Sequence, residues 1–112
     1  MEQITWQDFQ KVELRVGTIL DVEDFPEARN PAFKLKIDFG EEIGIKKSSA
    51  QITDIYEKND LLGKQVMAVV NFPAKQIGPM MSECLVTGFH DASGAVVLVS
   101  PDDVVPNGAK LL

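Results

Sequence analysis

One stretch of the chain constrains its fold more than any other: residues 32–40, AFKLKIDFG, where apolar and charged side chains alternate without a break. Because successive side chains of a β-strand point to opposite faces, this strand has one apolar and one charged face. Such a strand is typical of an antiparallel sheet that packs one face on a core and exposes the other. The apolar face holds Phe33, Leu35, Ile37 and Phe39, and the charged face holds Lys34, Lys36 and Asp38.

Other segments carry strand patterns as well. LRVGTILDVEDF (14–25) alternates with a period of two. Its predicted common face consists of Leu14, Val16, Thr18, Leu20 and Val22. After a turn at Gly40 and Glu41, EIGIKKS (42–48) completes a hairpin with the preceding strand. Two nearly continuous apolar strands follow, KQVMAVVNF (64–72) and ECLVTGF (83–89), and AVVLVS (95–100) is a further strand or the return arm of the one before it.

The segment between the third and fourth strands changes period. In SSAQITDIYEKND (48–60), Ile52, Ile55 and Tyr56 fit a short helix that ends near Asn59, with Ser49 as a candidate cap. Short strands in this order favour an all-β single domain over residues 1–112. We predict a five-stranded OB-fold barrel with one main helix between strands 3 and 4 and a short N-terminal helix. An antiparallel barrel of another topology also fits the pattern.

The charge of the chain counts against one class of function. The net charge is −6 and the pI is about 4.6, whereas phosphate contacts make nonspecific nucleic-acid binders basic. A local basic patch on an acidic body is still compatible with these values. The start, MEQITWQDF, lacks the pattern of a signal peptide, no run is long enough for membrane insertion, and Cys84 is the only cysteine. These features predict a cytoplasmic protein.

Residues for catalysis do not fall into recognisable motifs. His90, the only histidine, follows Cys84 by six residues. In an extended strand this separation is roughly 20 Å, too far for a thiol–imidazole pair. No nucleotide-binding or metal-binding motif is present, and the paired carboxylates at 41–42 and 102–103 lie in predicted turns. We therefore predict a binding protein that is not an enzyme and has no cofactor or metal; a carboxylate dyad across the fold is the catalytic alternative left open.

Long runs of the sequence resemble the CsaA family of bacterial export-related chaperones. The matching runs are ELRVGTI, ARNPAFKLKIDFG, IKKSSAQIT, LLGKQVMAVVNFPAKQI, SECLV and VPNG, in the same order and over essentially the whole chain. CsaA is in turn similar to the tRNA-binding OB domain appended to some methionyl-tRNA synthetases. The resemblance implies an OB fold, a homodimer, and binding of unfolded or pre-export polypeptides in the cytoplasm. It also makes the secretion motor ATPase a candidate partner.

One segment departs from the tRNA-binding relatives in a consistent direction. After the fourth strand, their pattern is roughly N-L-x-P-R-K-M and then S-E-G-M, which Asn71, Ser82 and Glu83 match here. Lys75 replaces the Arg and Gln76 replaces the Lys. A fork that grips phosphate thus becomes a point charge, and a second cation becomes an amide. The resemblance therefore implies a site that keeps its scaffold but binds anions less well.

Two ligands compete for this region in our prediction. The first is unfolded polypeptide, because methionines accept varied apolar partners and an acidic surface favours the basic ends of secretory precursors. The predicted peptide cleft consists of Phe72, Met80 and Met81, rimmed by Lys75, Gln76 and Ser82. The alternative is tRNA on the OB-fold face, with candidate contacts at Lys34, Lys36, Lys46, Asn71, Lys75 and Ser82. Strand parity is expected to turn Lys47 inward, beside Ile43 and Ile45.

Both ends of the chain carry apolar residues that a barrel interior does not require. Thr5 is a typical N-cap with Asp8 three positions later, which predicts a helix over about residues 5–12. The last strand, 95–100, is apolar on both faces. We expect the N-terminal helix and the C-terminal tail 101–112 to form a two-fold homodimer interface. Its predicted residues are Trp6, Phe9, Val97, Val99, Leu111 and Leu112.

Overall fold

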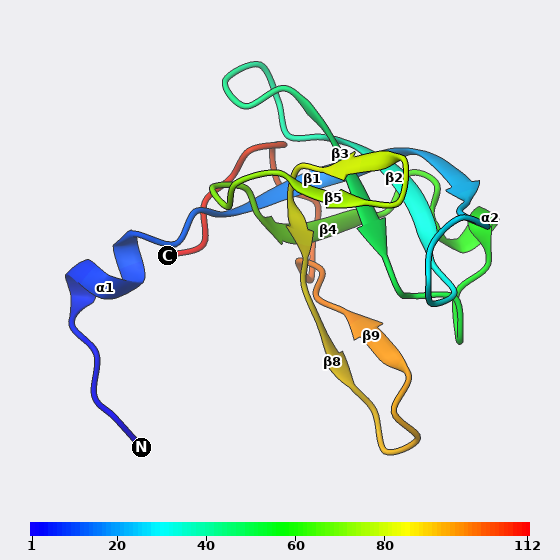
Figure 1. Cartoon of the computed structure of the whole chain (residues 1–112). Helices are drawn as coiled ribbons and strands as arrows, with labels where there is room; N and C mark the ends of the chain where they lie inside the picture. Colours follow the sequence, from blue (N-terminus) through cyan, green and yellow to red (C-terminus); the bar gives the residue numbers. More distant parts are fainter.

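The computed structural model describes all residues from Met1 to Leu112 and is an all-β fold with two very short helices (Figure 1). The five-stranded sheet has the order β3-β2-β1-β4-β7, with every neighbouring pair antiparallel. Its strands are β1 (Leu14–Asp24), β2 (Phe33–Asp38), β3 (Ile45–Ala50), β4 (Gln65–Val69) and β7 (Leu85–Val86).

The two edges of this sheet meet just before β7. The Glu83 N–H donates to the Lys47 carbonyl at 2.8 Å, and the Lys47 N–H donates to the Glu83 carboxylate at 2.9 Å. The sheet therefore curls into a nearly closed five-stranded antiparallel barrel. This agrees with the predicted all-β barrel, although β3 and β7 are held together by a few contacts rather than by a long ladder.

The alternating residues of β2 fill the barrel as predicted. Leu35 is 1% exposed, and both Ile37 and Phe39 are 0% exposed. Gly17 on β1 makes room for them, since a Cβ there would lie 2.6 Å from Ile37 and 2.7 Å from Phe39. Phe33 of β2 is also in the main core, and the other strands and the segments between them supply the rest of it: Ile19, Val22, Ala50, Ile52, Leu61, Val66, Ala68, Cys84 and Leu98.

The inward face of β1 differs from the prediction. The register of β1 against β2 shifts between Ile19 and Asp21, which marks a β-bulge at Leu20. Ile19 and Val22 face the core, while Leu20 is 48% exposed. The predicted continuous face from Leu14 through Val22 is wrong, because a bulge adds one residue and reverses the parity beyond it.

The helix between the third and fourth strands occupies its predicted place in the chain but is only α2 (Lys58–Leu61). Ile52 and Tyr56 precede it on either side of a turn at 53–55 and still point inward: Ile52 is 3% exposed, and the Tyr56 hydroxyl accepts the Leu98 N–H at 3.0 Å. The spacing of Ile52 and Tyr56 therefore resembles that of a helix face, although the chain around them is not helical. Ser49 lies in β3 and caps no helix, so the predicted cap is wrong.

Two hairpins extend the barrel (Figure 1). One joins β5 (Lys75–Ile77) to β6 (Met80–Ser82) through Gly78, whose φ of 54° suits glycine. The other joins β8 (Gly88–His90) to β9 (Val96–Leu98) and projects away from the sheet. The predicted strand 83–89 is therefore divided between β7 and β8, and the segment 95–100 contains the return arm.

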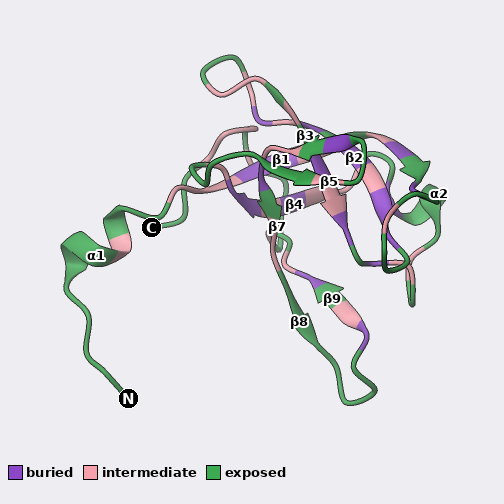
Figure 2. Cartoon of the chain, in the orientation of Figure 1, coloured by how far each residue is buried: buried purple, intermediate pink, exposed green.

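The two ends of the chain behave differently. The predicted N-terminal helix is confirmed as α1 (Trp6–Gln10), with reciprocal hydrogen bonds between Thr5 and Asp8, and it stands apart from the barrel (Figure 1). The C-terminal tail instead pairs with β1, where the Leu111 N–H donates to the Leu14 carbonyl at 2.9 Å. Figure 2 shows the contrast: α1 is mostly exposed, whereas buried residues recur along β1, β2, β3 and β4. No helix has the length and apolar character needed to cross a bilayer.

Candidate functional site

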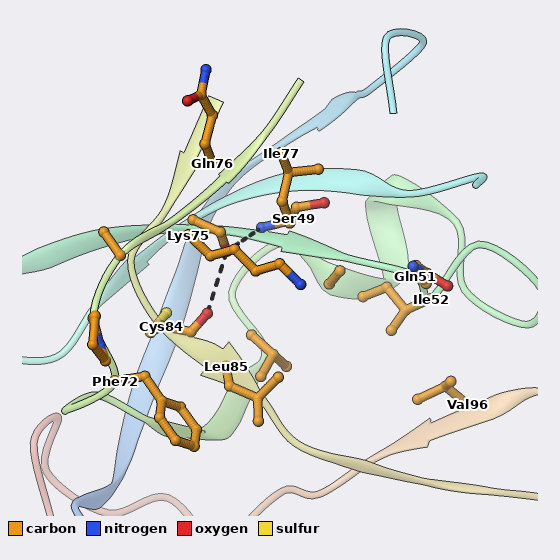
Figure 3. A pocket seen from close by; sticks show the side chains of 15 residues that line it. Ser49, Gln51, Ile52, Phe72, Lys75, Gln76, Ile77, Cys84, Leu85 and Val96 are labelled. Carbon is orange, nitrogen blue, oxygen red and sulfur yellow. Dashed lines mark hydrogen bonds between the residues drawn. The ribbon is translucent and has the colours of Figure 1, made fainter. Parts of the chain in front are cut away.

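A groove of about 880 Å³ opens where β3 and β7 separate (Figure 3). The end of β3 forms one wall, the segment from Phe72 to Ile77 forms another, and β7 forms the floor. Most of its lining residues are apolar. They are Ser49, Ala50, Gln51, Ile52, Phe72, Pro73, Ala74, Lys75, Gln76, Ile77, Ser82, Cys84, Leu85, Val86 and Val96.

Large apolar side chains in the groove face solvent. Phe72 is 56% exposed and Leu85 is 52% exposed, and they lie near each other in Figure 3. Val86 and Val96 continue the apolar surface. Several large apolar side chains on one concave surface are typical of a binding site, whereas single exposed ones are common everywhere.

Serine hydroxyls hold the groove together. The Ser49 N–H donates to Ser82 Oγ at 3.1 Å, which fastens β6 to β3 (Figure 3). The Ser48 hydroxyl is fully buried and donates to the Cys84 carbonyl at 3.1 Å, which fastens the start of β7 to the same strand. The seam of the barrel, where β3 approaches β6 and β7, is therefore closed by these bonds and not by a β-ladder. Ser82, a predicted contact residue, thus also has a structural role.

Cys84 lines the groove but is not poised for chemistry. Its side chain is 6% exposed, and burial raises the pKa of the thiol to about 11. The thiol is therefore protonated at neutral pH, whereas nucleophilic cysteines react as thiolates. No group of three His, Cys, Asp or Glu side chains is arranged to hold a metal ion.

The structure separates the residues of the predicted peptide cleft. Phe72, Lys75, Gln76 and Ser82 line the groove together. Met80 does not line it: this side chain is 8% exposed and packs with Phe25 and Ala32 in a small second core. Met81, 42% exposed, lies on the same hairpin outside the groove lining. Leu85, which the sequence prediction left out, takes the place in the apolar surface that we expected for the methionines.

The outer face of β2 and β3 carries a different set of lysines from the predicted one. Lys36 lies opposite Lys47 in the ladder, whereas Lys46 lies opposite the fully buried Ile37. Directly opposite residues share a face, so Lys47 points outward with Lys36 and Lys46 lies on the inward side. The predicted parity of Lys46 and Lys47 is wrong because the small buried Ser48 fixes the inward register of β3.

Carboxylates are interleaved with the lysines of this face. Lys34 Nζ lies 3.6 Å from a Glu23 carboxylate oxygen and 5.6 Å from the Phe25 ring centroid. Lys36 lies opposite Asp21 in the β1–β2 ladder. The basic patch considered for tRNA is therefore a surface of alternating charge.

Asn71, another candidate tRNA contact, is engaged within the chain. Its Oδ1 accepts the Glu13 N–H at 3.1 Å, and its Nδ2 donates to the Lys11 carbonyl at 2.7 Å. These bonds fix the segment after α1 to the end of β4, immediately before Phe72. Sequence spacing carries no signal for this link, because its partners are main-chain groups far away in the chain.

The residues predicted for a dimer interface lie at the surface of the single chain. Trp6 is 60% exposed and its ring centroid is 5.4 Å from that of Phe9. Val97, Leu111 and Leu112 are also exposed, and Val99 is half-buried. The structure therefore leaves an apolar surface on α1 and further apolar side chains on β9 and the tail.

Comparison with known proteins places this architecture among characterised domains. The family model described as a putative tRNA binding domain matches residues 14–110. The solved structure of chaperone CsaA from Bacillus anthracis has 48% sequence identity and a TM-score of 0.91, covering 99% of this chain and 100% of that one. The CsaA chaperone from Picrophilus torridus has 52% identity and a TM-score of 0.91, covering 98% of this chain and 100% of that one.

Sequence relatives include much longer proteins. The methionine–tRNA ligase of Flavobacterium johnsoniae is 32% identical over 108 residues, or 96% of this chain. The chain spans only 15% of the length of that ligase. The similarity therefore concerns one domain of the enzyme.

Proposed function

The chain belongs to the family of putative tRNA binding domains and is CsaA-like within it, and on this basis we propose that it captures non-native polypeptide in the groove between β3 and β7. The observation that carries the proposal is the pair Phe72 and Leu85, each more than half exposed on one concave surface. The two similar CsaA structures are described as chaperones, which supports the same function.

The expected strength of capture is modest. Full burial of a Phe or Leu side chain contributes about 1.5–3 kcal/mol, so covering the exposed halves of two such residues contributes about 1.5–3 kcal/mol in total. Binding of this size is reversible, as holding and release of a client require. Two grooves on one particle would strengthen it through avidity.

We also propose a homodimer formed by α1 and the C-terminal segment. The exposed Trp6 supports it, since a helix as short as α1 is marginal on its own. Light scattering at micromolar concentration is expected to give about twice the 12.3 kDa chain mass. A mass of one chain would contradict this part of the proposal. We place the activity in protein export in the cytoplasm, with the secretion motor ATPase as a candidate partner.

tRNA binding is the second candidate function. It is supported by the family match and by the outward lysines Lys36 and Lys47. The interleaved carboxylates and the net charge of −6 weigh against tight binding of a polyanion.

A salt series with one preparation distinguishes the two functions. Binding of an unfolded precursor and of total tRNA is measured by fluorescence anisotropy as the salt concentration rises. Apolar capture is expected to persist, whereas tRNA binding falls steeply because counterions are released. If the precursor fails to bind while tRNA does, polypeptide capture is rejected in favour of the second candidate.

A further inference from the structure

The charge of the groove is opposite in sign to the charge of the molecule. The chain has a net charge of −6, yet Lys75 is the only charged residue among those that line the groove. Cys84, the other titratable residue there, stays neutral because burial raises its pKa to about 11. The side chains that line the groove therefore carry one positive charge and no negative one.

Lys75 also lacks a partner within the chain. Its ammonium makes no ion pair or hydrogen bond, whereas Lys34, Lys58 and Lys110 each pair with a carboxylate. In Figure 3 its side chain extends over the groove, away from Phe72 and toward Ile52. An unpaired ammonium is thus held beside an apolar surface.

Covering this ammonium has a predictable effect on specificity. An apolar ligand segment that displaces water from the groove also removes water from Lys75, which is unfavourable unless an opposite charge replaces it. A carboxylate next to the apolar segment offsets that cost, and a second ammonium adds repulsion. Such complementarity acts mainly on the choice of partner.

Free main-chain groups identify the ligand as a polypeptide. The N–H and C=O of Gln51, at the end of β3, have no hydrogen-bond partner in the chain. Thr87 donates to the Met67 carbonyl, so in the antiparallel β4–β7 ladder the main-chain groups of Val86 point away from β4. Val86 lines the groove. Exposed strand edges of this kind bind extended peptide through its backbone.

We infer that the groove selects extended apolar segments that carry an acidic residue, and that Lys75 is the residue that selects them. This inference rests on the proposed polypeptide capture and specifies its ligand. It differs from the expectation drawn from net charge, which favoured basic segments. Local charge prevails because Lys75 lies in the groove lining and the surplus carboxylates do not.

The test uses three labelled peptides that share one apolar core and carry Glu, Gln or Lys beside it. Anisotropy titrations at low salt compare the unmodified protein with Lys75→Gln and Lys75→Glu. We expect the Glu peptide to bind about fivefold more tightly than the Lys peptide, as a partly exposed ion pair permits. Lys75→Gln should make the three affinities equal, and Lys75→Glu should reverse their order.

Lys36→Glu is the matched control, because it makes the same change in net charge at an exposed lysine outside the groove lining. It should leave the order of affinities intact. If Lys36→Glu alters the order as much as Lys75→Glu, or if the Lys peptide binds best to the unmodified protein, the inference is wrong while polypeptide capture stands. If no peptide binds, the proposed function itself fails and the inference fails with it.

Discussion

Two lysine-bearing surfaces of this molecule differ in what surrounds the charge. On the outer face of β2, Lys34 lies 3.6 Å from Glu23, and Lys36 lies opposite Asp21. In the groove, Lys75 lies among mostly apolar lining residues, none of which is a carboxylate. Lysine thus alternates with carboxylates on the solvated outer face of β2, whereas in the groove it has no ion-pair partner. Neighbouring groups, and not the net charge of the chain, decide what each surface can bind.

The two surfaces also differ in backbone structure. The β2 face lies within long ladders to β1 and β3, the first interrupted only by the bulge at Leu20. The groove lies at the seam, where Ser82 and Glu83 contribute bonds that a strand would otherwise make. The barrel therefore presents unpaired main chain and open apolar surface at the same location, which a complete ladder would have closed.

The largest effect on polypeptide capture is expected when the apolar surface of the groove is removed. Phe72→Ser with Leu85→Ser should weaken capture of unfolded polypeptide about 30-fold, since about 2 kcal/mol of apolar burial is lost. Both side chains are more than half exposed, so the fold should persist. Leu62→Ser, at a leucine 48% exposed outside the groove, is the matched control and should bind normally.

The outer face of β2 and β3 that bears Lys36 and Lys47, called the lysine face below, should behave in the opposite way: its substitution should affect tRNA binding and not polypeptide capture. Lys36→Glu with Lys47→Glu is expected to remove any tRNA shift on a native gel while polypeptide capture stays within about twofold, because exposed charges at a distance contribute little. Loss of capture in this variant would mean that the two surfaces act as one site.

Met80 and Met81 separate packing from surface exposure. Met80→Ala should lower the free energy of unfolding by about 2 kcal/mol, at the low end for a buried methionine because its core cluster is small. Met81→Ala should change it by less than about 0.5 kcal/mol. Urea unfolding measures both values, and equal values would place Met80 at the surface, contrary to its 8% exposure.

Asn71→Ala tests the link between α1 and the groove. Loss of its hydrogen bonds to Lys11 and Glu13 should cost about 1–2 kcal/mol. Amide exchange in the α1 segment and at Phe72 should accelerate together. Asn30→Ala, at an exposed asparagine in the loop of residues 25–32, should leave the exchange rates unchanged. Unchanged exchange in Asn71→Ala as well would show that the link is not important.

The smallest expected effect is on acid stability. Hydrogen bonds from Lys110 and then Arg15 hold the pKa of Glu13 below its ordinary value of 4.5. A depressed pKa in the folded state adds stability above pH 4.5, and this contribution is lost as the pH falls through the lower folded value. Glu13→Gln should therefore flatten the decline of stability in acid. An unchanged decline would show that these contacts are fully screened.

The sequence predicted the parts of the fold that rest on periodicity. The alternation in β2 and the capping pair Thr5–Asp8 were sufficient, because each depends on near neighbours in the chain. The bulge at Leu20 and the turns around Ile52 were missed, because they depend on packing against distant strands.

The sequence likewise predicted only part of the candidate site. Phe72 and Lys75 lie in the groove, as the segment pattern indicated. Leu85 was left out of the predicted cleft, although it stands at the Met of the S-E-G-M pattern of the tRNA-binding relatives. Its exposure depends on the gap between β3 and β7, which strand periodicity does not predict. Met80 is of a residue type that is common in adaptable binding sites, but its side chain is buried in the second core against Phe25 and Ala32.

The central claim is that polypeptide binds at the groove and not on the lysine face. Amide chemical shifts measured during titration with an unfolded client test it most directly. The claim predicts shifts at Gln51, Leu85 and Val86, with Lys36 and Lys47 unmoved. Shifts at Lys36 and Lys47 with unmoved groove amides would contradict it.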